Sequence, residues 1–362
     1  MTRPIHHILF CIAMLCSGLL NAQQQKLFTN LPSSYSGVNF RNDIAEDQTM
    51  YYYLYEYLYN GGGVAAGDIN NDGLPDLYFT STRGSNQLFL NLGNCKFKDI
   101  SADAGIDGGP GIKTGVNMID INNDGWLDIY VCRSGPFDAQ YRKNMLYINN
   151  HNNTFTESAH AFGLDDDSYS TQSYFFDYDL DGDLDLFLTN HTSDFTSANL
   201  VNGTYVNGKL TMIADTNRRY VSNRLYENRK GHFYDVSPKA GIMNNAFGLS
   251  ACIYDFNEDG WPDVYVCNDF NMPDFLYINN KNGTFSEHMK DYMDHISLSS
   301  MGSDISDINN DGREDLFVLD MAIEDPVRQK QLYVQNQNYD KFHLMNTLGM
   351  YYQFPHNVLQ LN

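Results

Sequence analysis

The chain has 362 residues, a length that fits one large domain or two of ordinary size. Its formal net charge of −22 at pH 7 argues against a nucleic-acid partner, because binding to phosphates depends on Lys and Arg. Aromatic residues make up 14% of the chain, too many for a disordered protein, so the acidic charge needs a local explanation.

Residues 1–22 have the pattern of a secretory signal peptide. Arg3 lies in a short basic start, and an apolar run from Ile8 to Leu20 precedes a small residue, Ala22. This run has 13 residues, fewer than the roughly 20 of a membrane-spanning helix, and later apolar runs are shorter still. We therefore predict a mature chain that is secreted or lies on the cell-envelope surface, without a membrane span. A lipoprotein cut before Cys16 is the alternative, although the Leu usual three places earlier is absent.

A tyrosine-rich segment lies between the signal peptide and the main part of the chain. Residues 51–59 contain six tyrosines in nine positions. Tyr most often packs its ring into a core and lets its hydroxyl reach out, so we predict packing. A surface on which carbohydrate stacks is the alternative.

Five Asp-rich loops divide the rest of the chain into tandem repeats. They start at Asp68, Asp120, Asp177, Asp255 and Asp307, which are 52, 57, 78 and 52 residues apart. Periods of this length are typical of propellers, solenoids and arrays. The predicted repeats cover residues 63–106, 115–164, 171–242, 248–296 and 301–362.

Each repeat contains segments for four antiparallel strands. In the first repeat, residues 63–68 run into the loop, residues 77–79 leave it, and residues 86–91 and 96–100 flank an Asn/Gly turn. The segment after the loop is apolar at consecutive positions in every repeat, which requires burial on both faces. We therefore predict an all-β chain that forms a β-propeller of four-stranded antiparallel blades, as one domain over residues 23–362.

The loops have the composition of a calcium site. Positions 1, 3, 5 and 9 carry oxygen side chains and position 6 is Gly, which suits a hard cation with six to eight oxygen ligands. An EF-hand is excluded because position 12 is apolar rather than Glu. The sixteen carboxylates of these sets explain much of the charge, and they repel one another unless a cation neutralises them. We predict about five structural Ca²⁺ ions; ordinary Asp-Asn-Gly turns are the alternative. The predicted ligands are Asp68, Asn70, Asp72, Asp76, Asp120, Asn122, Asp124, Asp128, Asp177, Asp179, Asp181, Asp185, Asp255, Asn257, Asp259, Asp263, Asp307, Asn309, Asp311 and Asp315.

Residues 67–79 and 284–287 resemble FG-GAP/VCBS repeats, the calcium-bearing blades that also form the heads of integrin α-subunits. Residues 59–65, 175–185 and 300–302 resemble secreted bacterial proteins related to cartilage acidic protein, which often end in an ASPIC/UnbV domain. The resemblance implies a calcium-bearing propeller and a role in extracellular recognition or adhesion.

Propellers of this family usually have seven blades, which the five repeats do not reach. Residues 357–362 correspond to the third strand of a fifth blade. We therefore expect the last blade to be incomplete and the full-length protein to continue beyond residue 362.

The four mature cysteines predict no metal or disulfide site. Their spacing fits no zinc pattern. Cys132 and Cys267 hold equivalent places in the second and fourth repeats, a whole repeat apart, so a bond between them is not expected. We predict that these two, Cys95 and Cys252 are buried free thiols.

The face opposite the calcium loops is the predicted ligand face. The long insertions, residues 192–222 and 321–356, both follow a second strand, and insertions on one face of a repeat protein often mark its binding face. Polar residues just past the second strands could ring the channel mouth there; ordinary loop residues are the alternative. The candidates are Arg133, His191, Asp269 and Asp320.

These features predict a non-catalytic recognition or adhesion module that binds an extracellular protein or glycan. The alternative is an envelope enzyme acting on polysaccharide, a glycosidase or lyase, because a fold does not determine a function. Such an enzyme needs two carboxylates, or an acid with His or Arg, about 5 to 9 Å apart, and the four ligand-face candidates are the residues available. A purely structural envelope component is a third possibility.

Overall fold

The computed structural model describes residues 27–192, 194–195, 201, 203–212, 220–323, 325–331 and 339–362. The predicted signal peptide lies outside these residues. Within them, no helix is both long and apolar enough to cross a membrane.

The main strands of the described chain form five antiparallel sheets. Four sheets have four strands and the fifth has three, and in each sheet every strand pairs with the next one in chain order. The strands are, sheet by sheet, β1 (Val64–Gly67), β2 (Asp76–Phe79), β3 (Gln87–Asn91) and β4 (Phe97–Asp99); β5 (Ile112–Ile119), β6 (Asp128–Ser134), β7 (Met145–Asn149) and β8 (Phe155–Glu157); β9 (Ser170–Phe176), β10 (Asp185–Asn190), β13 (Arg224–Asn228) and β14 (Phe233–Asp235); β15 (Gly248–Tyr254), β16 (Asp263–Asn268), β17 (Phe275–Asn279) and β18 (Phe285–Glu287); and β20 (Ser300–Ser306), β21 (Asp315–Asp320) and β23 (Val358–Gln360).

Short helices and two minor strand pairs complete the described structure. A single helical turn follows the fourth strand of each four-stranded sheet: α3 (Ser101–Ala104), α4 (Ala159–Phe162), α5 (Ser237–Ala240) and α6 (Met289–Tyr292). The remaining elements are α2 (Ser33–Ser36), η1 (Glu56–Tyr59), η2 (Ala139–Tyr141), the hairpin of β11 (Gly203–Val206) and β12 (Lys209–Met212), the parallel pair β19 (Ile296–Ser297) and β22 (Gln353–Phe354), α7 (Pro326–Gln331) and α8 (Tyr339–Thr347).

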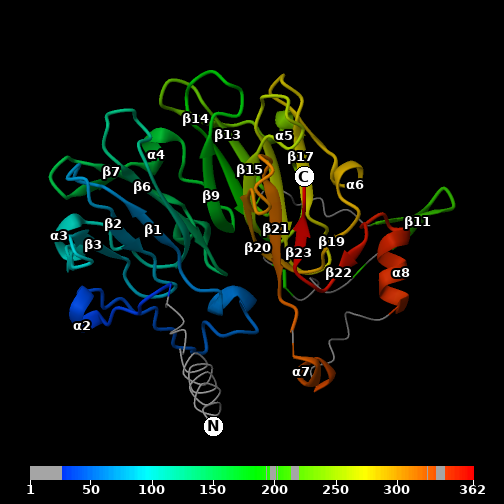
Figure 1. Ribbon diagram of the computed structural model, residues 1–362, viewed down its shortest axis with the longest axis horizontal. Helices are drawn as coiled ribbons and strands as arrows, with labels where there is room; N and C mark the ends of the chain where they lie inside the picture. Colours follow the sequence, from blue (N-terminus) through cyan, green and yellow to red (C-terminus); the bar gives the residue numbers. More distant parts are fainter. Residues whose placement is uncertain are drawn as a thin grey trace, which may run out of the picture.

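Successive sheets pack against each other through their faces. Each of four hydrophobic clusters joins neighbouring sheets; one contains Tyr78 of β2 with Val131 of β6, and the next contains Tyr130 of β6 with Leu186 of β10. Two further clusters join the third sheet to the fourth and the fourth to the fifth. The first strands β1, β5, β9, β15 and β20 contact each other in the same order. The sheets therefore follow one another across the molecule, from the β1–β4 sheet at the left of Figure 1 to the β20–β21–β23 sheet at the right.

In the three middle sheets, the second strand is the most buried strand. Every residue of β6, β10 and β16 is buried, as the apolar sequence of these segments predicts. In the first and last sheets, β2 is only partly buried, and β21 exposes Phe317 and Leu319. These two sheets lie at the ends of the series, so each has a described neighbour on one face only.

The tyrosine-rich segment contributes to a separate core. Tyr55 and Tyr57 are buried with Met50 and Leu58, and they contact aromatic rings of distant segments. Those rings include Phe195, after the third sheet's second strand, and Phe247, before β15. The predicted packing is therefore correct for these two tyrosines, while Tyr51, Tyr52, Tyr53 and Tyr59 are exposed.

The cysteines are free thiols, as predicted, but they are not all buried. Cys132, Cys252 and Cys267 are buried between the sheets. The prediction was wrong for Cys95, which is exposed in the turn between β3 and β4, where its φ of 55° places it beside Asn94 in the left-handed region.

Candidate functional site

All five Asp-rich loops have the same backbone. Position 4 is left-handed in each, with φ between 56° and 59°, and the Gly at position 6 has φ between 85° and 96°. The position-1 carboxylate accepts the N–H groups of positions 5 and 6; in the first loop, the Asp72 and Gly73 nitrogens lie 3.1 and 2.7 Å from Asp68. These contacts turn the chain so that the side chains of positions 1, 3 and 5 come from one tight turn.

The Asp at position 9 joins each loop to its sheet. One carboxylate oxygen accepts the N–H of loop position 2, and the other accepts the N–H of a residue near the end of the third strand. In the third loop, Asp185 accepts the nitrogens of Tyr178 at 3.1 Å and Asn228 at 2.8 Å. All five loops share this double contact, made by Asp76, Asp128, Asp185, Asp263 and Asp315.

The third loop holds its carboxylates closest to the arrangement that a cation needs. Oxygen atoms of Asp177, Asp179 and Asp185 all lie within 4.8 Å of one another. The Oδ1 atom of Asp179 is buried and has no hydrogen-bond partner among the described residues. In the first loop, Asn70 at the same position 3 donates to Asp72 at 3.0 Å instead. A buried carboxylate oxygen without a donor fits a hard cation with oxygen ligands, so the residues of this loop suit Ca²⁺.

Burial makes the position-9 carboxylates of the first four loops expensive to ionise. It raises the pKa of Asp128 and of Asp263 to about 6 and that of Asp185 to about 7. Burial, followed by the nearby Asp181 carboxylate, also raises the pKa of Asp179. Desolvation and like charges both disfavour the charged form, and a bound cation would offset both.

The four ligand-face candidates lie at the ends of the second strands, but three are buried. Arg133 is buried and donates to the carbonyls of Pro110 and Lys143. Asp269 is buried and accepts the Tyr57 hydroxyl at 3.1 Å. Asp320 is half-buried and accepts the Ser297 hydroxyl at 2.6 Å. In this structure these groups hold loops and the tyrosine-rich segment in place.

His191 is fully buried beside the rings of Tyr55, Tyr57 and Phe195. Its Nδ1 lies 2.7 Å from the Thr192 carbonyl, which can only accept, so Nδ1 carries the proton. Nε2 then accepts hydrogen bonds from Ser134 at 2.8 Å and Tyr55 at 3.3 Å. Burial lowers the pKa of His191 to about 4. The imidazole is therefore neutral at pH 7.

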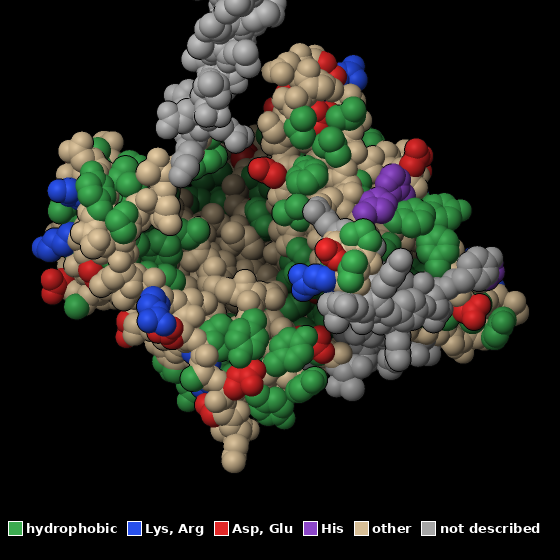
Figure 2. All heavy atoms as spheres, turned by 60° about the horizontal axis from the view of Figure 1, so that its bottom comes forward, with side chains coloured by type: hydrophobic (Ala, Val, Ile, Leu, Met, Phe, Trp, Pro, Cys, Tyr) green, Lys and Arg blue, Asp and Glu red, His purple; other side chains and the backbone are tan. Residues whose placement is uncertain are grey.

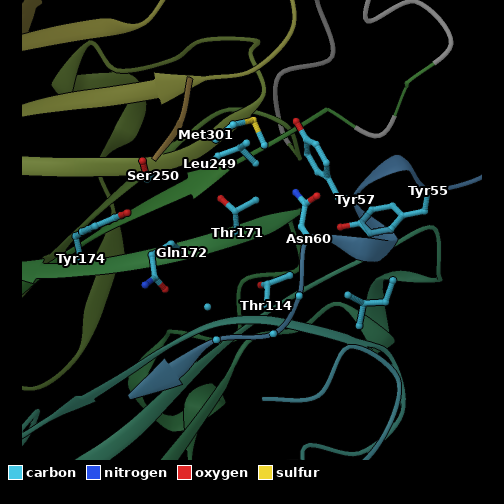
Figure 3. Close-up of a pocket in the computed structure, with 15 residues that line it drawn as sticks. Tyr55, Tyr57, Asn60, Thr114, Thr171, Gln172, Tyr174, Leu249, Ser250 and Met301 are labelled. Carbon is cyan, nitrogen blue, oxygen red and sulfur yellow. The ribbon is translucent and has the colours of Figure 1, made fainter. Parts of the chain in front are cut away.

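A cavity of about 500 Å³ lies beside the tyrosine-rich segment and was not predicted from the sequence. Tyr55 and Tyr57 lie at one end of it, and the first strands β5, β9 and β15 supply much of its wall (Figure 3). Figure 2 shows a hollow near the centre of the molecule, whose floor is mainly backbone and uncharged polar side chains.

The cavity wall repeats from sheet to sheet. The residue six places before the first Asp of every loop lines the cavity; these residues are Gly62, Thr114, Thr171, Leu249 and Met301. In the last four sheets the pairing of the first two strands shifts at this place. A bulge re-aims a side chain, so each of these four sheets directs one residue toward the cavity. Alignment of the repeats on their loops would have found this position.

Together, the repeated sheets and loops define a class of protein with internal β repeats. The sequence matches the FG-GAP-like repeat family over residues 50–131 and 255–318. These two segments therefore carry FG-GAP-like repeats.

Within this class, the chain is similar to cartilage acidic protein 1. It is 27% identical to the mouse protein over 237 residues, which cover 63% of this chain and 32% of that protein, and 25% identical to the human protein over 232 residues, which cover 64% and 32%. The chain thus spans about a third of the length of these relatives. Among solved structures, the Vibrio cholerae biofilm matrix protein Bap1 matches 72% of this chain and 34% of its own at 14% identity, with a TM-score of 0.37.

Proposed function

We propose that the chain is an extracellular recognition or adhesion module, built as a β-propeller that calcium ions stabilise. The observation that carries this proposal is the fivefold repetition of one acidic loop with one backbone conformation and one set of hydrogen bonds. A repeated turn without a ligand would not need a buried carboxylate oxygen without a hydrogen-bond donor, such as Oδ1 of Asp179.

The packing of the sheets supports the propeller. Consecutive four-stranded sheets pack face to face, and their first strands contact each other in sequence. This is the relation between neighbouring blades around a central channel. The cavity lined by equivalent residues of successive sheets lies where such a channel would be.

Calcium would act as a structural component. In the third loop, Asp177, Asp179, Asp181 and Asp185 would hold the ion, and the corresponding side chains would do so in the other loops. The bound charge would offset the repulsion within each loop and the burial of its position-9 carboxylate. The loop would then hold the first strand against the second and third.

Similarity to cartilage acidic protein 1, whose name refers to cartilage, a tissue rich in extracellular matrix, supports a place outside the cell. The predicted signal peptide agrees with this location. The four ligand-face candidates make internal hydrogen bonds, which favours a binding role over an enzyme that needs free carboxylates at this site.

The calcium part of the proposal is tested by melting the mature chain with and without EGTA and by counting bound ions by calorimetry. We expect about five ions and a clear drop in melting temperature after chelation. Equal melting temperatures would contradict it. The recognition part is tested with arrays of glycans and extracellular proteins, and cleavage of an arrayed polysaccharide would indicate the enzyme instead.

A further inference from the structure

The cavity beside the tyrosine-rich segment has the size and shape of a ligand site. Its volume of about 500 Å³ lies within the range of small-molecule pockets. Tyr55 and Tyr57 bound one end, and both are anchored, Tyr55 to His191 and Tyr57 to Asp269. The cavity therefore suits a single compact group better than an extended chain passing through.

The chemistry of the wall excludes a charged ligand. Among the described residues that line the cavity, none is charged, although the protein as a whole carries a net charge of −22. A cation would be bound by carboxylates, and an anion would need Lys, Arg or clustered N–H groups. The ligand that matches this wall is uncharged.

Two neighbouring walls of the cavity differ in polarity. Thr114, Thr171 and Gln172 come from β5 and β9, whereas Leu249 and Met301 come from β15 and β20 and lie close together in Figure 3. A tyrosine ring, that of Tyr57, lies beside them (Figure 3). A sugar ring has the same division, with hydroxyls at its edge and apolar C–H groups on its faces.

Gln172 is placed to meet such a ligand. A Cβ atom at position 115 would lie 1.9 Å from the Gln172 Oε1, so only glycine at position 115 leaves room for this side chain along the wall. The Oε1 atom accepts the Ser173 N–H at 3.2 Å, while Nε2 has no hydrogen-bond partner among the described residues. The side-chain amide of Asn60, also on the wall, has none there either. Both can donate to hydroxyls.

The repeated bulge explains how a uniform scaffold could gain specificity. In the last four sheets the bulge presents a residue at the same place, but these residues differ from sheet to sheet: Thr114, Thr171, Leu249 and Met301. The calcium loops, by contrast, are nearly identical. Variation confined to one ring of positions is typical of a binding site on a repeat protein.

We propose that this cavity binds one uncharged sugar ring, either free or at the end of an extracellular glycan. The proposal rests on the proposed function as a recognition module and names its ligand class and site. Gln172 and Asn60 would donate to the sugar hydroxyls, and Leu249, Met301 and Tyr57 would cover an apolar face of the ring.

The test titrates the calcium-loaded mature chain with glucose, galactose, mannose and N-acetylglucosamine, with glucuronic acid as the charged comparison, by calorimetry and saturation-transfer NMR. Arrays that display the same sugars at the ends of glycans separate free sugars from terminal units. We expect at least one neutral sugar to bind, and the charged sugar to bind at least tenfold more weakly. Equal binding of glucuronic acid, or no binding of any neutral sugar in either format, would overturn the proposal.

Two variants locate the site. Gln172→Leu should weaken sugar binding about tenfold, because it removes one hydrogen-bond donor. Leu249→Trp should abolish binding by filling the cavity. The matched control, Gln87→Leu, lies in β3 outside the cavity and should leave affinity unchanged. Unchanged affinity in both cavity variants would contradict the proposal. Binding of a peptide instead of a sugar, if Leu249→Trp prevents that binding, would contradict it as well.

Melting of the same samples with and without EGTA keeps the two proposals apart. A chain that gains stability from calcium but binds no sugar refutes only the ligand class. A chain that is indifferent to calcium refutes the calcium-stabilised scaffold, whatever it binds.

Discussion

At the scale of single residues, one difference among the loops stands out. Position 3 is Asn in four loops and Asp in the third, where Asp179 has a buried oxygen without a hydrogen-bond donor. Asn70 and Asn122 instead donate to the neighbouring position-5 carboxylate at 3.0 Å. The third loop should therefore depend most on a cation, because it contains the most negative charge and the fewest internal donors.

Asp179→Asn should raise the melting temperature of the calcium-free chain. The difference in melting temperature between the calcium-loaded and the calcium-free chain should therefore become smaller. Satisfying a buried polar group contributes roughly 1 to 3 kcal/mol. Differential scanning calorimetry with and without EGTA measures both temperatures.

The reciprocal change, Asn122→Asp in the second loop, is the matched control. It should lower the melting temperature of the calcium-free chain and increase the difference in melting temperature between the calcium-loaded and the calcium-free chain. If both substitutions shift the calcium-free melting temperature in the same direction, the repulsion argument is wrong.

His191 should make the fold sensitive to acid. Its pKa is about 4 in the folded chain, against an ordinary value of 6.5, so the unfolded chain binds the extra proton first. The stabilisation from the neutral imidazole is complete above pH 6.5 and is lost as the pH falls toward 4, by an amount on the order of 3 kcal/mol.

Chemical denaturation of wild type and His191→Gln between pH 7 and 4, in saturating calcium, measures this effect. The variant should show a shallower loss of stability over this range. The same substitution at the exposed His160 should leave the slope as in wild type. A wild-type slope in His191→Gln would show that the buried imidazole is not the titrating group.

At the scale of elements, the loop and its sheet form one structural unit. The glycine at position 6 permits the turn, the position-1 carboxylate closes it, and the position-9 carboxylate binds it to the third strand. Distortion of the turn should therefore reach the pairing of the first three strands of that sheet.

Gly182→Val should destabilise the third sheet and reduce the number of bound calcium ions by about one. The φ of Gly182 is +96°, which a β-branched residue adopts only with strain of about 1 to 3 kcal/mol. Calorimetric ion counting and melting measure the two effects.

Gly302→Val is the control, because φ of Gly302 lies outside the left-handed region and an added Cβ would meet no atom within 4 Å. Gly208, in the turn of the exposed β11–β12 hairpin, would not serve as the control, because its φ of +79° would strain a valine there as well. Equal losses of bound calcium in Gly182→Val and Gly302→Val would count against the assignment of the loop.

At the scale of the whole molecule, the tyrosine-rich segment joins sheets that are far apart in sequence. Its buried residues pack with Ile112 at the start of β5, Phe195 after β10 and Phe247 just before β15. The four clusters between sheets hold neighbours only, so this fifth cluster connects across them. It also bounds the cavity through Tyr55 and Tyr57.

Leu58→Ala should lower the free energy of unfolding by roughly 2 to 5 kcal/mol, because Leu58 is fully buried in this cluster. The matched substitution, Leu54→Ala, should cost less than about 1 kcal/mol because Leu54 is 40% exposed. Equilibrium urea denaturation of the two variants measures the difference. Similar losses would show that the segment does not act as a connecting core.

The sequence by itself determined the local features of this protein. The spacing of the five loops, the apolar second strands and the position-6 glycines predicted the repeated antiparallel sheets, because strand patterns and turn conformations depend on near neighbours. The acidic residues of the loops could be listed for the same reason, and their role as calcium ligands stays a prediction.

Only the tertiary structure decided which polar residues are free. Arg133, His191 and Asp269 seemed available on a predicted face, but their partners Pro110, Tyr55 and Tyr57 come from other parts of the chain. The partial burial of β2, the exposure of Phe317 and Leu319 in β21, and the cavity beside Tyr57 likewise depend on which sheets meet. Burial and hydrogen-bond satisfaction are set by contacts between distant segments, which a pattern along the chain does not contain.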